Sequence, residues 1–139
     1  MRYRRLKYRY AMVLTSSETG LLANNWRAGQ IGVVIAQPRF RPPADVYETA
    51  DAIHVTIELA GIEPDELEAV LYEDAVVVEG ERRLKPAEAD GVYHVAEIRQ
   101  GSFRLELPLP ASVDLEQVEA RYEQGLLRLM FCKQQVGGT

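Results

Sequence analysis

The sequence IHVTIEL at positions 53–59 alternates apolar and polar residues without interruption. Successive side chains of a β-strand point to opposite faces, so this period of two predicts a half-buried strand. Residues 61–65 follow with turn composition, and a second alternation begins at Leu67 and continues to Leu71. This region therefore predicts two neighbouring strands joined by a turn.

The same character extends to the end of the chain. Strand-like segments occupy residues 75–79, 92–96 and 101–107, and a final hairpin joins residues 118–122 to 127–131. No amphipathic helix separates these segments, although one helical turn could form around residue 115. Short strands at this spacing predict an all-β fold, an antiparallel immunoglobulin-like β-sandwich.

Three prolines, at positions 38, 42 and 43, forbid a helix there and favour an extended linker. They divide the chain into a basic, partly apolar and partly disordered amino-terminal arm with its linker (residues 1–43), a sandwich domain (44–133) and a short tail (134–139). The first part carries eight Lys and Arg against one acid, and the remainder eight against twenty, so their net charges are +7 and −12. This asymmetry predicts two roles, or a basic arm that meets an acidic body.

The chain has the composition of a soluble globular protein. Its 139 residues are 47% hydrophobic and 27% charged, which allows one ordinary core without disulfides or metals. The single cysteine, Cys132, excludes an intrachain disulfide and is typical of a reducing compartment. No apolar run is long enough to span a bilayer or to form a secretory signal, so we expect a cytoplasmic protein.

Motifs of catalysis and metal binding are absent from the sequence. No glycine precedes a lysine, which excludes the phosphate-binding loop of nucleotide hydrolases, and no serine lies in a Gly-x-Ser-x-Gly turn. His54 and His94 are far apart and accompanied by one cysteine, so no zinc-ligand spacing occurs. The acids would suffice for a two-carboxylate glycosidase, but Glu58, Glu66 and Glu68 occupy outward strand positions typical of a solvated face. We expect no enzymatic activity, no metal and no cofactor.

Residues 45–133 resemble the α-crystallin domain of the small heat-shock proteins, of the bacterial and plant type. The order and spacing of several short pieces carry the resemblance: residues 45–49, 55–62 and 77–83, Tyr93-His94, Gly101-Ser102-Phe103 with Leu109-Pro110, and Ala120 with Gly125-Leu126-Leu127. The resemblance implies a compact antiparallel sandwich and an ATP-independent chaperone, a holdase that binds unfolding client proteins and prevents their aggregation. It also implies a homodimer that assembles into larger oligomers.

The long loop of residues 84–100 is where the resemblance places the dimer contact. In the bacterial and plant type a strand of this loop pairs with the partner's sheet, and such pairing covers an exposed strand edge. The contact residues implied in this chain are Asp45, Val46, Tyr47, Val92, Tyr93, His94, Val95, Glu97 and Arg99.

Several positions depart from the family pattern. Ile98 and Leu105 stand where arginine is common, with Arg104 displaced by one, and Cys132 replaces a proline. Apolar packing would then replace buried charge pairs at the dimer contact, which need not weaken it. The tail of residues 134–139 lacks the Ile-x-Ile motif that docks into a neighbour's groove, so a dimer is the expected default.

The amino-terminal arm offers a substitute for that motif, because residues 31–35 contain the same alternation of branched side chains. We hypothesise that they fill a groove formed by Leu67, Ala69, Leu71, Val118, Ala120 and Tyr122. The alternative is an arm packed on its own sandwich. Since hydrophobic attraction is not directional, unfolding clients are expected to bind the apolar residues of the arm. These are Leu21, Leu22, Trp26, Ile31, Val33, Val34 and Ile35.

Two other functions are compatible with the sequence. The basic start of the chain, with Tyr3, Tyr8 and Tyr10 between its arginines, could bind RNA or an anionic surface. A solvated arm explains the same run more simply, so we expect no nucleic-acid partner. A β-sandwich that acts as an adaptor or co-chaperone for one defined partner is the second alternative.

Overall fold

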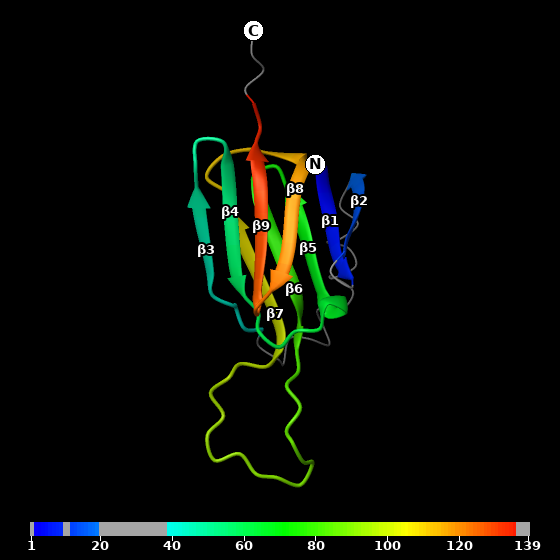
Figure 1. Ribbon diagram of the computed structural model, residues 1–139, viewed down its shortest axis with the longest axis vertical. Coiled ribbons are helices and arrows are strands. Elements are labelled where there is room, and N and C mark those ends of the chain that lie inside the picture. Colours follow the sequence, from blue (N-terminus) through cyan, green and yellow to red (C-terminus); the bar gives the residue numbers. More distant parts are fainter. Residues whose placement is uncertain (1, 10–11, 20–38, 136–139) are drawn as a thin grey trace.

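The computed structural model describes residues 2–9, 12–19 and 39–135, with the backbone alone for residues 6–9 and 12–19 (Figure 1). These residues form β-strands and one short 3-10 helix, η1 (Pro64–Glu66). The strands are β1 (Arg2–Arg9), β2 (Met12–Thr19), β3 (Ala44–Glu48), β4 (Ala52–Glu58), β5 (Leu67–Tyr72), β6 (Ala75–Arg82), β7 (Gly101–Pro108), β8 (Val113–Glu123) and β9 (Leu126–Lys133). No helix in this part of the chain is long and apolar enough to cross a membrane.

The strands form two antiparallel sheets packed face to face. One sheet has the strand order β2-β1-β5-β6-β7 and the other the order β3-β4-β9-β8. The predicted all-β, antiparallel sandwich is therefore confirmed. The alternation at positions 53–59 forms β4, whose Val55 lies opposite Leu129 of β9 in the register.

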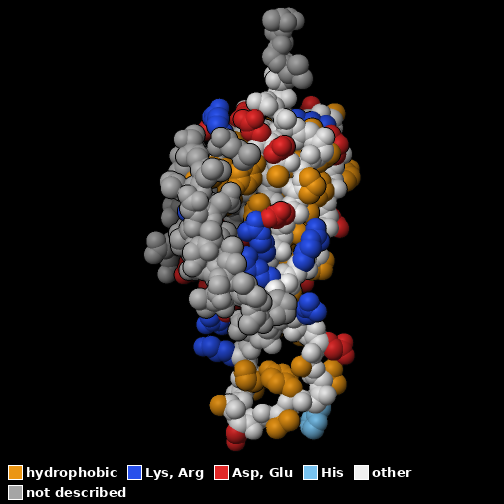
Figure 2. Space-filling view, turned by 180° about the vertical axis from the view of Figure 1, so that it is seen from behind, with side chains coloured by type: hydrophobic (Ala, Val, Ile, Leu, Met, Phe, Trp, Pro, Cys, Tyr) orange, Lys and Arg blue, Asp and Glu red, His pale blue; other side chains and the backbone are white. Residues whose placement is uncertain are grey.

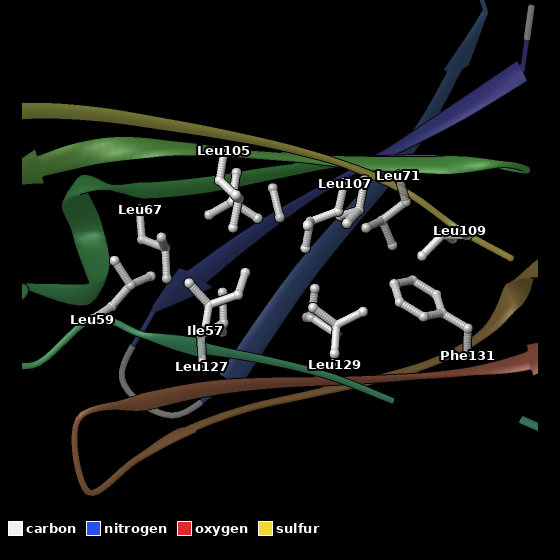
Figure 3. Close-up of a cluster of buried hydrophobic side chains, with 14 of the residues drawn as sticks. Ile57, Leu59, Leu67, Leu71, Leu105, Leu107, Leu109, Leu127, Leu129 and Phe131 are labelled. Atoms are coloured by element: carbon white, nitrogen blue, oxygen red, sulfur yellow. The ribbon is translucent and has the colours of Figure 1, made fainter. Parts of the chain in front are cut away.

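The core lies between the sheets (Figure 3). Ile53, Val55 and Ile57 are completely buried, whereas the residues between them on β4 are partly exposed, as the period of two predicts. Leu71 of β5 and Phe131 of β9 come from the two opposing sheets and are also fully buried. Side chains from both sheets fill the core.

A tight turn closes the hairpin of β8 and β9. Gln124 and Gly125 have positive φ angles of 55° and 77°, which is the backbone of the two-residue hairpin turns that match strand twist. A Cβ atom on Gly125 would lie 3.0 Å from the Cβ of Ala60, so a side chain there would crowd the end of β4. The helical turn that could have formed around residue 115 is absent: β8 begins at Val113 and contains a register irregularity before Val118.

The linker before β3 is extended and is fixed on the edge of β7. The amide of Phe40 donates to the carbonyl oxygen of Ser102, and the amide of Arg104 donates to the carbonyl oxygen of Phe40, each at 3.1 Å. The ring of Phe40 lies 5.6 Å from that of Phe103. Extended backbone agrees with the prolines around it, and the pairing covers part of a sheet edge.

Strands β1 and β2 were not predicted. The sequence analysis placed them in the partly disordered arm, yet β1 pairs antiparallel with β5 and β2 pairs with β1. The beginning of the chain thus extends the sheet rather than leaving the sandwich (Figure 1). Their pattern gave little signal, because polar and basic residues dominate both segments.

Candidate functional site

The loop between β6 and β7 carries most of the exposed apolar surface. Among the described residues, large hydrophobic side chains are exposed at only six positions, and four of them lie in this loop. Val92 is 79% exposed, Val95 70%, Ile98 66% and Tyr93 60%. Isolated exposed hydrophobic residues are common on proteins, but a cluster of this kind marks an interaction site.

The loop projects beyond the end of the sandwich (Figure 1). Figure 2 shows it as a ring with apolar side chains along its length. None of the residues 83–100 is in a strand. An open hollow inside the loop is lined by Pro86, Ala87, Glu88, Gly91, Val92 and Tyr93.

The other two exposed positions, Val46 and Tyr47, lie on β3. This strand pairs with β4 on one side and, within the described part of the chain, with no strand on the other. The Tyr47 ring packs 6.0 Å from the ring of His54 on β4. Free amide and carbonyl groups along such an edge can pair with another strand, so β3 is a second surface suited to another polypeptide.

The structure brings the implied dimer-contact residues into two separate groups. Asp45, Val46 and Tyr47 lie on β3, and the remainder lie in the loop. All of them are exposed. Within one chain the loop lies beyond the end of the sandwich and β3 lies along its side, so the two groups occupy different places (Figure 1).

Arg82 holds the base of the loop, a role that the sequence analysis missed. Its side chain is buried, and its Nε donates to the carbonyl oxygen of Arg99 at 2.9 Å. Its Nη1 donates to the carbonyl oxygen of Ala60 at 3.4 Å, and its guanidinium lies 4.9 Å from the centre of the Phe40 ring. An arginine can make several such contacts at once because its planar group carries five donors. Residues 77–83 contributed to the family resemblance, but no local pattern indicated that Arg82 would be buried.

A second contact closes the same base. The backbone amide of Leu84 donates a hydrogen bond to Oε1 of Gln100 at 2.9 Å. Together with Arg82 it ties the first residues of the loop to the last. Hydrogen bonds therefore hold the base of the loop, and the rest of the loop projects from the sandwich.

The residues that are predicted to form a groove lie on β5 and β8. Leu67, Ala69 and Leu71 are buried, and the β8 side chains at alternate positions (Val118, Ala120 and Tyr122) are half-buried and pack on the core. The strand that runs along this edge is β1, because it pairs with β5. The hypothesised occupant, residues 31–35, lies outside the described residues, and so do the predicted client-binding residues between 21 and 35.

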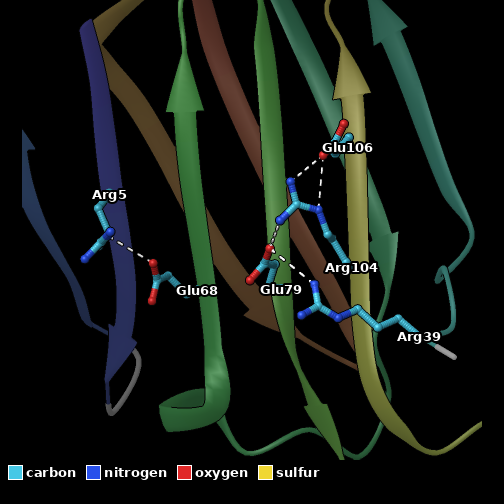
Figure 4. A network of polar contacts seen from close by, with 6 residues as sticks. All are labelled: Arg5, Arg39, Glu68, Glu79, Arg104 and Glu106. Atoms are coloured by element: carbon cyan, nitrogen blue, oxygen red, sulfur yellow. Dashed lines mark hydrogen bonds and ion pairs between the residues drawn. The ribbon is translucent and has the colours of Figure 1, made fainter. Parts of the chain in front are cut away.

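The departure at positions 104 and 105 has a structural reason. Leu105 is 1% exposed and belongs to the core, whereas Arg104 points to the opposite face of β7. There Arg104 pairs with Glu79 and Glu106, and Arg39 lies 4.0 Å from Glu79 (Figure 4). The chain thus keeps one arginine on this strand but directs it to the outer face of the sheet.

Three further ionisable residues of the described part of the chain, Arg83, His94 and Cys132, lie in the loop or near the end of β9. Glu81 raises the pKa of the exposed Arg83 side chain by a hydrogen bond and by its charge. His94 is exposed in the loop, and Cys132 is half-buried near the end of β9. No group of three His, Cys, Asp or Glu in the described part of the chain could hold a metal ion.

Comparison with known proteins identifies the fold. The Hsp20/alpha crystallin family matches residues 45–137. The chain belongs to this family. Small heat shock protein C2 of Rickettsia felis is 29% identical over 98 residues, which are 70% of this chain and 64% of that protein. The 17.7 kDa class II heat shock protein of Arabidopsis thaliana is 36% identical over 93 residues, 66% of this chain and 60% of the relative.

Solved structures of the family agree with this architecture. Heat shock protein 16.0 from Schizosaccharomyces pombe has a TM-score of 0.64 at 26% identity, over 73% of this chain and 94% of that one. HspA from Xanthomonas axonopodis has a TM-score of 0.61 at 25% identity, over 70% and 97%. The chain spans less than two thirds of the length of the curated relatives named above. The shared part is the sandwich domain of this small heat-shock protein.

Proposed function

We propose that this small heat-shock protein is an ATP-independent holdase, which binds unfolding proteins and prevents their aggregation. The observation that carries the proposal is the match to the Hsp20/alpha crystallin family over residues 45–137, and the structure adds an exposed apolar loop and a β3 edge that are suited to the pairing of two copies. Hydrophobic attraction and main-chain pairing recognise what unfolding proteins share without reading their sequence.

The working unit is a homodimer. The loop of one copy lies along β3 of the other, so that Val92, Tyr93 and Val95 cover Val46 and Tyr47. A two-fold axis repeats the contact, and both surfaces of each copy are then used. Each apolar side chain that becomes fully buried contributes about 1.5–3 kcal/mol before the cost of ordering the loop.

Clients bind the apolar residues of the amino-terminal segment, from Leu21 to Ile35. This role remains a prediction from the sequence. Residues 44–139 carry a net charge of −12. Mutual repulsion between such bodies keeps client-loaded particles in solution. Binding and release of clients then depend on the strength of these contacts, so we infer no enzymatic activity. We also infer that the protein acts in the cytoplasm.

The dimer is tested with charges in the loop. Val92→Asp and Val95→Asp together place two carboxylates in the proposed contact, and both positions are exposed in a single chain. We expect the mass measured by light scattering to fall to that of one chain, with the melting temperature of the sandwich preserved. Ala89→Asp is the matched control, because Ala89 is exposed in the same loop outside the apolar cluster. An unchanged mass in the double variant would place the dimer contact elsewhere.

The holdase activity is tested by heating an aggregation-prone enzyme with the protein and without nucleotide. Turbidity should fall as the subunit ratio rises, and added ATP should change nothing. Leu22→Asp with Trp26→Asp should weaken the protection, while Glu88→Gln, an exposed change of charge in the loop, should not. Turbidity equal to that of buffer at a subunit excess would end the proposal.

Binding of RNA by the start of the chain has less support. Tyr3 is 2% exposed and its ring lies 5.9 Å from that of Tyr72, so it is not available to stack on a base. Arg5 lies 3.0 Å from Glu68. These residues serve the sheet instead.

A further inference from the structure

Two buried hydrophobic residues lie outside the core. Among the described residues, Tyr3 and Val70 are the only buried hydrophobic residues that do not belong to the central cluster, and they are 2% and 5% exposed. Val70 lies between Ala69 and Leu71, which both belong to that cluster. Because successive side chains of a strand point to opposite faces, Val70 points to the outer face of the sheet, where most side chains meet solvent.

Tyr3 lies on the same outer face. The next residue, Arg4, donates from Nη1 to the carbonyl oxygen of Leu115 in the other sheet, so Arg4 faces inward and its two neighbours face outward. The Tyr3 ring lies 5.9 Å from the ring of Tyr72 on β5. The Nε atom of Arg5, the other neighbour, is also buried. Side chains of β1 and β5 are thus shielded from solvent on the face that points away from the core.

No described element covers this face. Every strand in the described part of the chain belongs to one of the two sheets, and the loop between β6 and β7 projects beyond the end of the sandwich (Figure 1). Val77 of β6 lies directly opposite Val70 and is half-buried, so hydrophobic side chains continue toward the middle of the sheet. We call Tyr3, Val70, Tyr72 and Val77 the outer patch. Its burial requires a further segment of polypeptide.

Residues 20–38, which lie outside the described residues, begin and end at opposite edges of this sheet. Strand β2 is one edge, and it ends at Thr19, opposite Arg2. At the other edge the linker pairs with β7, and Arg39 lies 4.0 Å from Glu79 on the outer face (Figure 4). The core fills the inner face, so the direct path between the two ends crosses the outer patch.

The length and composition of residues 20–38 fit this path. Four spacings between the five strands and one more to the linker, each about 4.8 Å, make the width about 24 Å, whereas nineteen extended residues can span about 60 Å. The segment contains one charged residue, Arg27, and its apolar residues include Trp26 and the run from Val33 to Ile35. It therefore has both the reach and the apolar side chains to cover the outer patch.

We propose that the outer patch is a docking surface and that its occupant is the segment of residues 20–38 of the same chain. The segment passes from the edge of β2 to Arg39 across the outer face, and its apolar side chains bury Tyr3 and Val70. Docking within one chain needs neither a second copy nor the predicted groove residues of β5, which face the core. Since clients are predicted to bind this segment, clients and the outer patch compete for it, and this consequence alone rests on the proposed function.

A photo-crosslinking amino acid in the outer patch identifies the occupant. Val77 is replaced with p-benzoylphenylalanine in the full chain, and nitrogen-15-labelled and unlabelled protein are unfolded together in urea, refolded and illuminated. Mass spectrometry then identifies the crosslinked peptides and shows whether both come from one copy. The same replacement at Thr56 is the matched control, because Thr56 is half-buried and faces outward on β4, an inner strand of the other sheet.

We expect position 77 to crosslink to residues 20–38 of the same copy, at several times the yield obtained from position 56. Crosslinks between a labelled and an unlabelled peptide would show that the segment of a second copy occupies the outer patch. Crosslinks outside residues 20–38, or a yield equal to that of the control, would show that the segment does not lie there. Each of these results would overturn the proposal.

Trp26 provides a second measurement, because it is the single tryptophan of the chain and lies in the proposed occupant. Val77→Asp places a carboxylate in the outer patch and should release the segment, so acrylamide should quench the fluorescence about threefold more strongly than in the unchanged protein. Thr56→Asp is the control and should leave quenching unchanged. Far-ultraviolet circular dichroism establishes that both variants keep the fold. Equal quenching in Val77→Asp and the unchanged protein would contradict docking at this surface.

Neither measurement includes a client protein, so failure of the docking surface leaves the holdase proposal standing. Conversely, a protein whose position 77 crosslinks to residues 20–38 but which gives no protection in the turbidity assay would lose the proposed function and keep the docking surface.

Discussion

Arg82 donates from Nε to the carbonyl oxygen of Arg99, 2.9 Å away, and this bond joins the two ends of the loop that carries the apolar cluster. Arg82 is the last residue of β6, and Arg99 lies two residues before β7. A buried charge is costly unless it is paired and its donors are satisfied; here the carbonyl oxygens of Arg99 and Ala60 accept from Arg82, the Phe40 ring lies against its guanidinium, and Oε1 of Glu58 lies 3.8 Å from its Nη1. The contacts of Arg82 therefore both hold the base of the loop and stabilise the sandwich.

Replacing Arg82 with methionine removes these donors while keeping most of the side-chain volume. We expect the free energy of unfolding to fall by about 1–3 kcal/mol, because the carbonyl oxygens of Arg99 and Ala60 lose their partner. Amide hydrogen exchange in residues 84–100 should become faster, and the dimer should weaken. Arg83→Met is the matched control, since Arg83 is the next residue and is exposed. Equal exchange in the two variants would mean that Arg82 does not hold the loop.

Phe40 connects the amino-terminal part of the chain to β7. Its side chain is 6% exposed and lies against Phe103, so Phe40→Ala should lower the free energy of unfolding by about 3–5 kcal/mol. Calorimetry measures the loss. Hydrogen exchange at Arg104, whose amide donates to the carbonyl oxygen of Phe40, should show that the linker has left the edge. Arg39→Ala should change little, because its nearest carboxylate is 4.0 Å away and exposed pairs contribute little.

The sandwich itself could be predicted because its strands are half-buried. The alternation at positions 53–59 follows directly from one face in the core and one in solvent, and the same holds for β7. Strand β1 gave no such signal. The strand joins the sheet through backbone pairing with β5 and through charged side chains. Its sequence, RYRRLKYR, therefore shows no alternation of apolar and polar residues.

The site could be predicted only in part. The resemblance located the loop and β3, and the structure exposes the apolar residues of both. The buried state of Arg82 was beyond reach, because arginine is usually exposed and its partners are main-chain oxygens far along the chain. Position 98, where the family commonly has arginine, holds an apolar residue that is 66% exposed in the single chain.

Leu105 and Arg104 are neighbours on β7 in different environments: Leu105 lies in the core and Arg104 on the outer face of the sheet. Leu105→Arg would restore an arginine at the position where the family commonly has one, yet it would place an unpaired charge in this core. We expect a loss of more than about 4 kcal/mol or failure to fold. Arg104→Leu removes a partly buried pair with Glu79 and a more exposed pair with Glu106, and should cost about 1–2 kcal/mol. Chemical denaturation of the two variants measures the contrast, and similar midpoints would contradict the assignment of Leu105 to the core.

Gly80 marks the closest approach of η1 to β6. A Cβ atom there would lie 2.3 Å from the carbonyl oxygen of Glu66 and 2.6 Å from Cζ of Phe103, so the backbone before β5 would have to move. We expect Gly80→Ala to lower the free energy of unfolding by about 1–3 kcal/mol, as overpacking does.

Gly91→Ala is the control for Gly80→Ala, because the nearest atom to its new Cβ is 3.6 Å away and the residue lies in the exposed loop. Urea denaturation, monitored by far-ultraviolet circular dichroism, measures the free energy of unfolding of the two variants. Since Gly80 lies opposite both Leu67 and Phe103 in the registers of β6, its substitution disturbs the edge that accepts β1 as well as the base of the loop. A neutral Gly80→Ala would show that η1 can move away from β6 without cost, and the close packing of these elements would then not be what fixes the β5 edge.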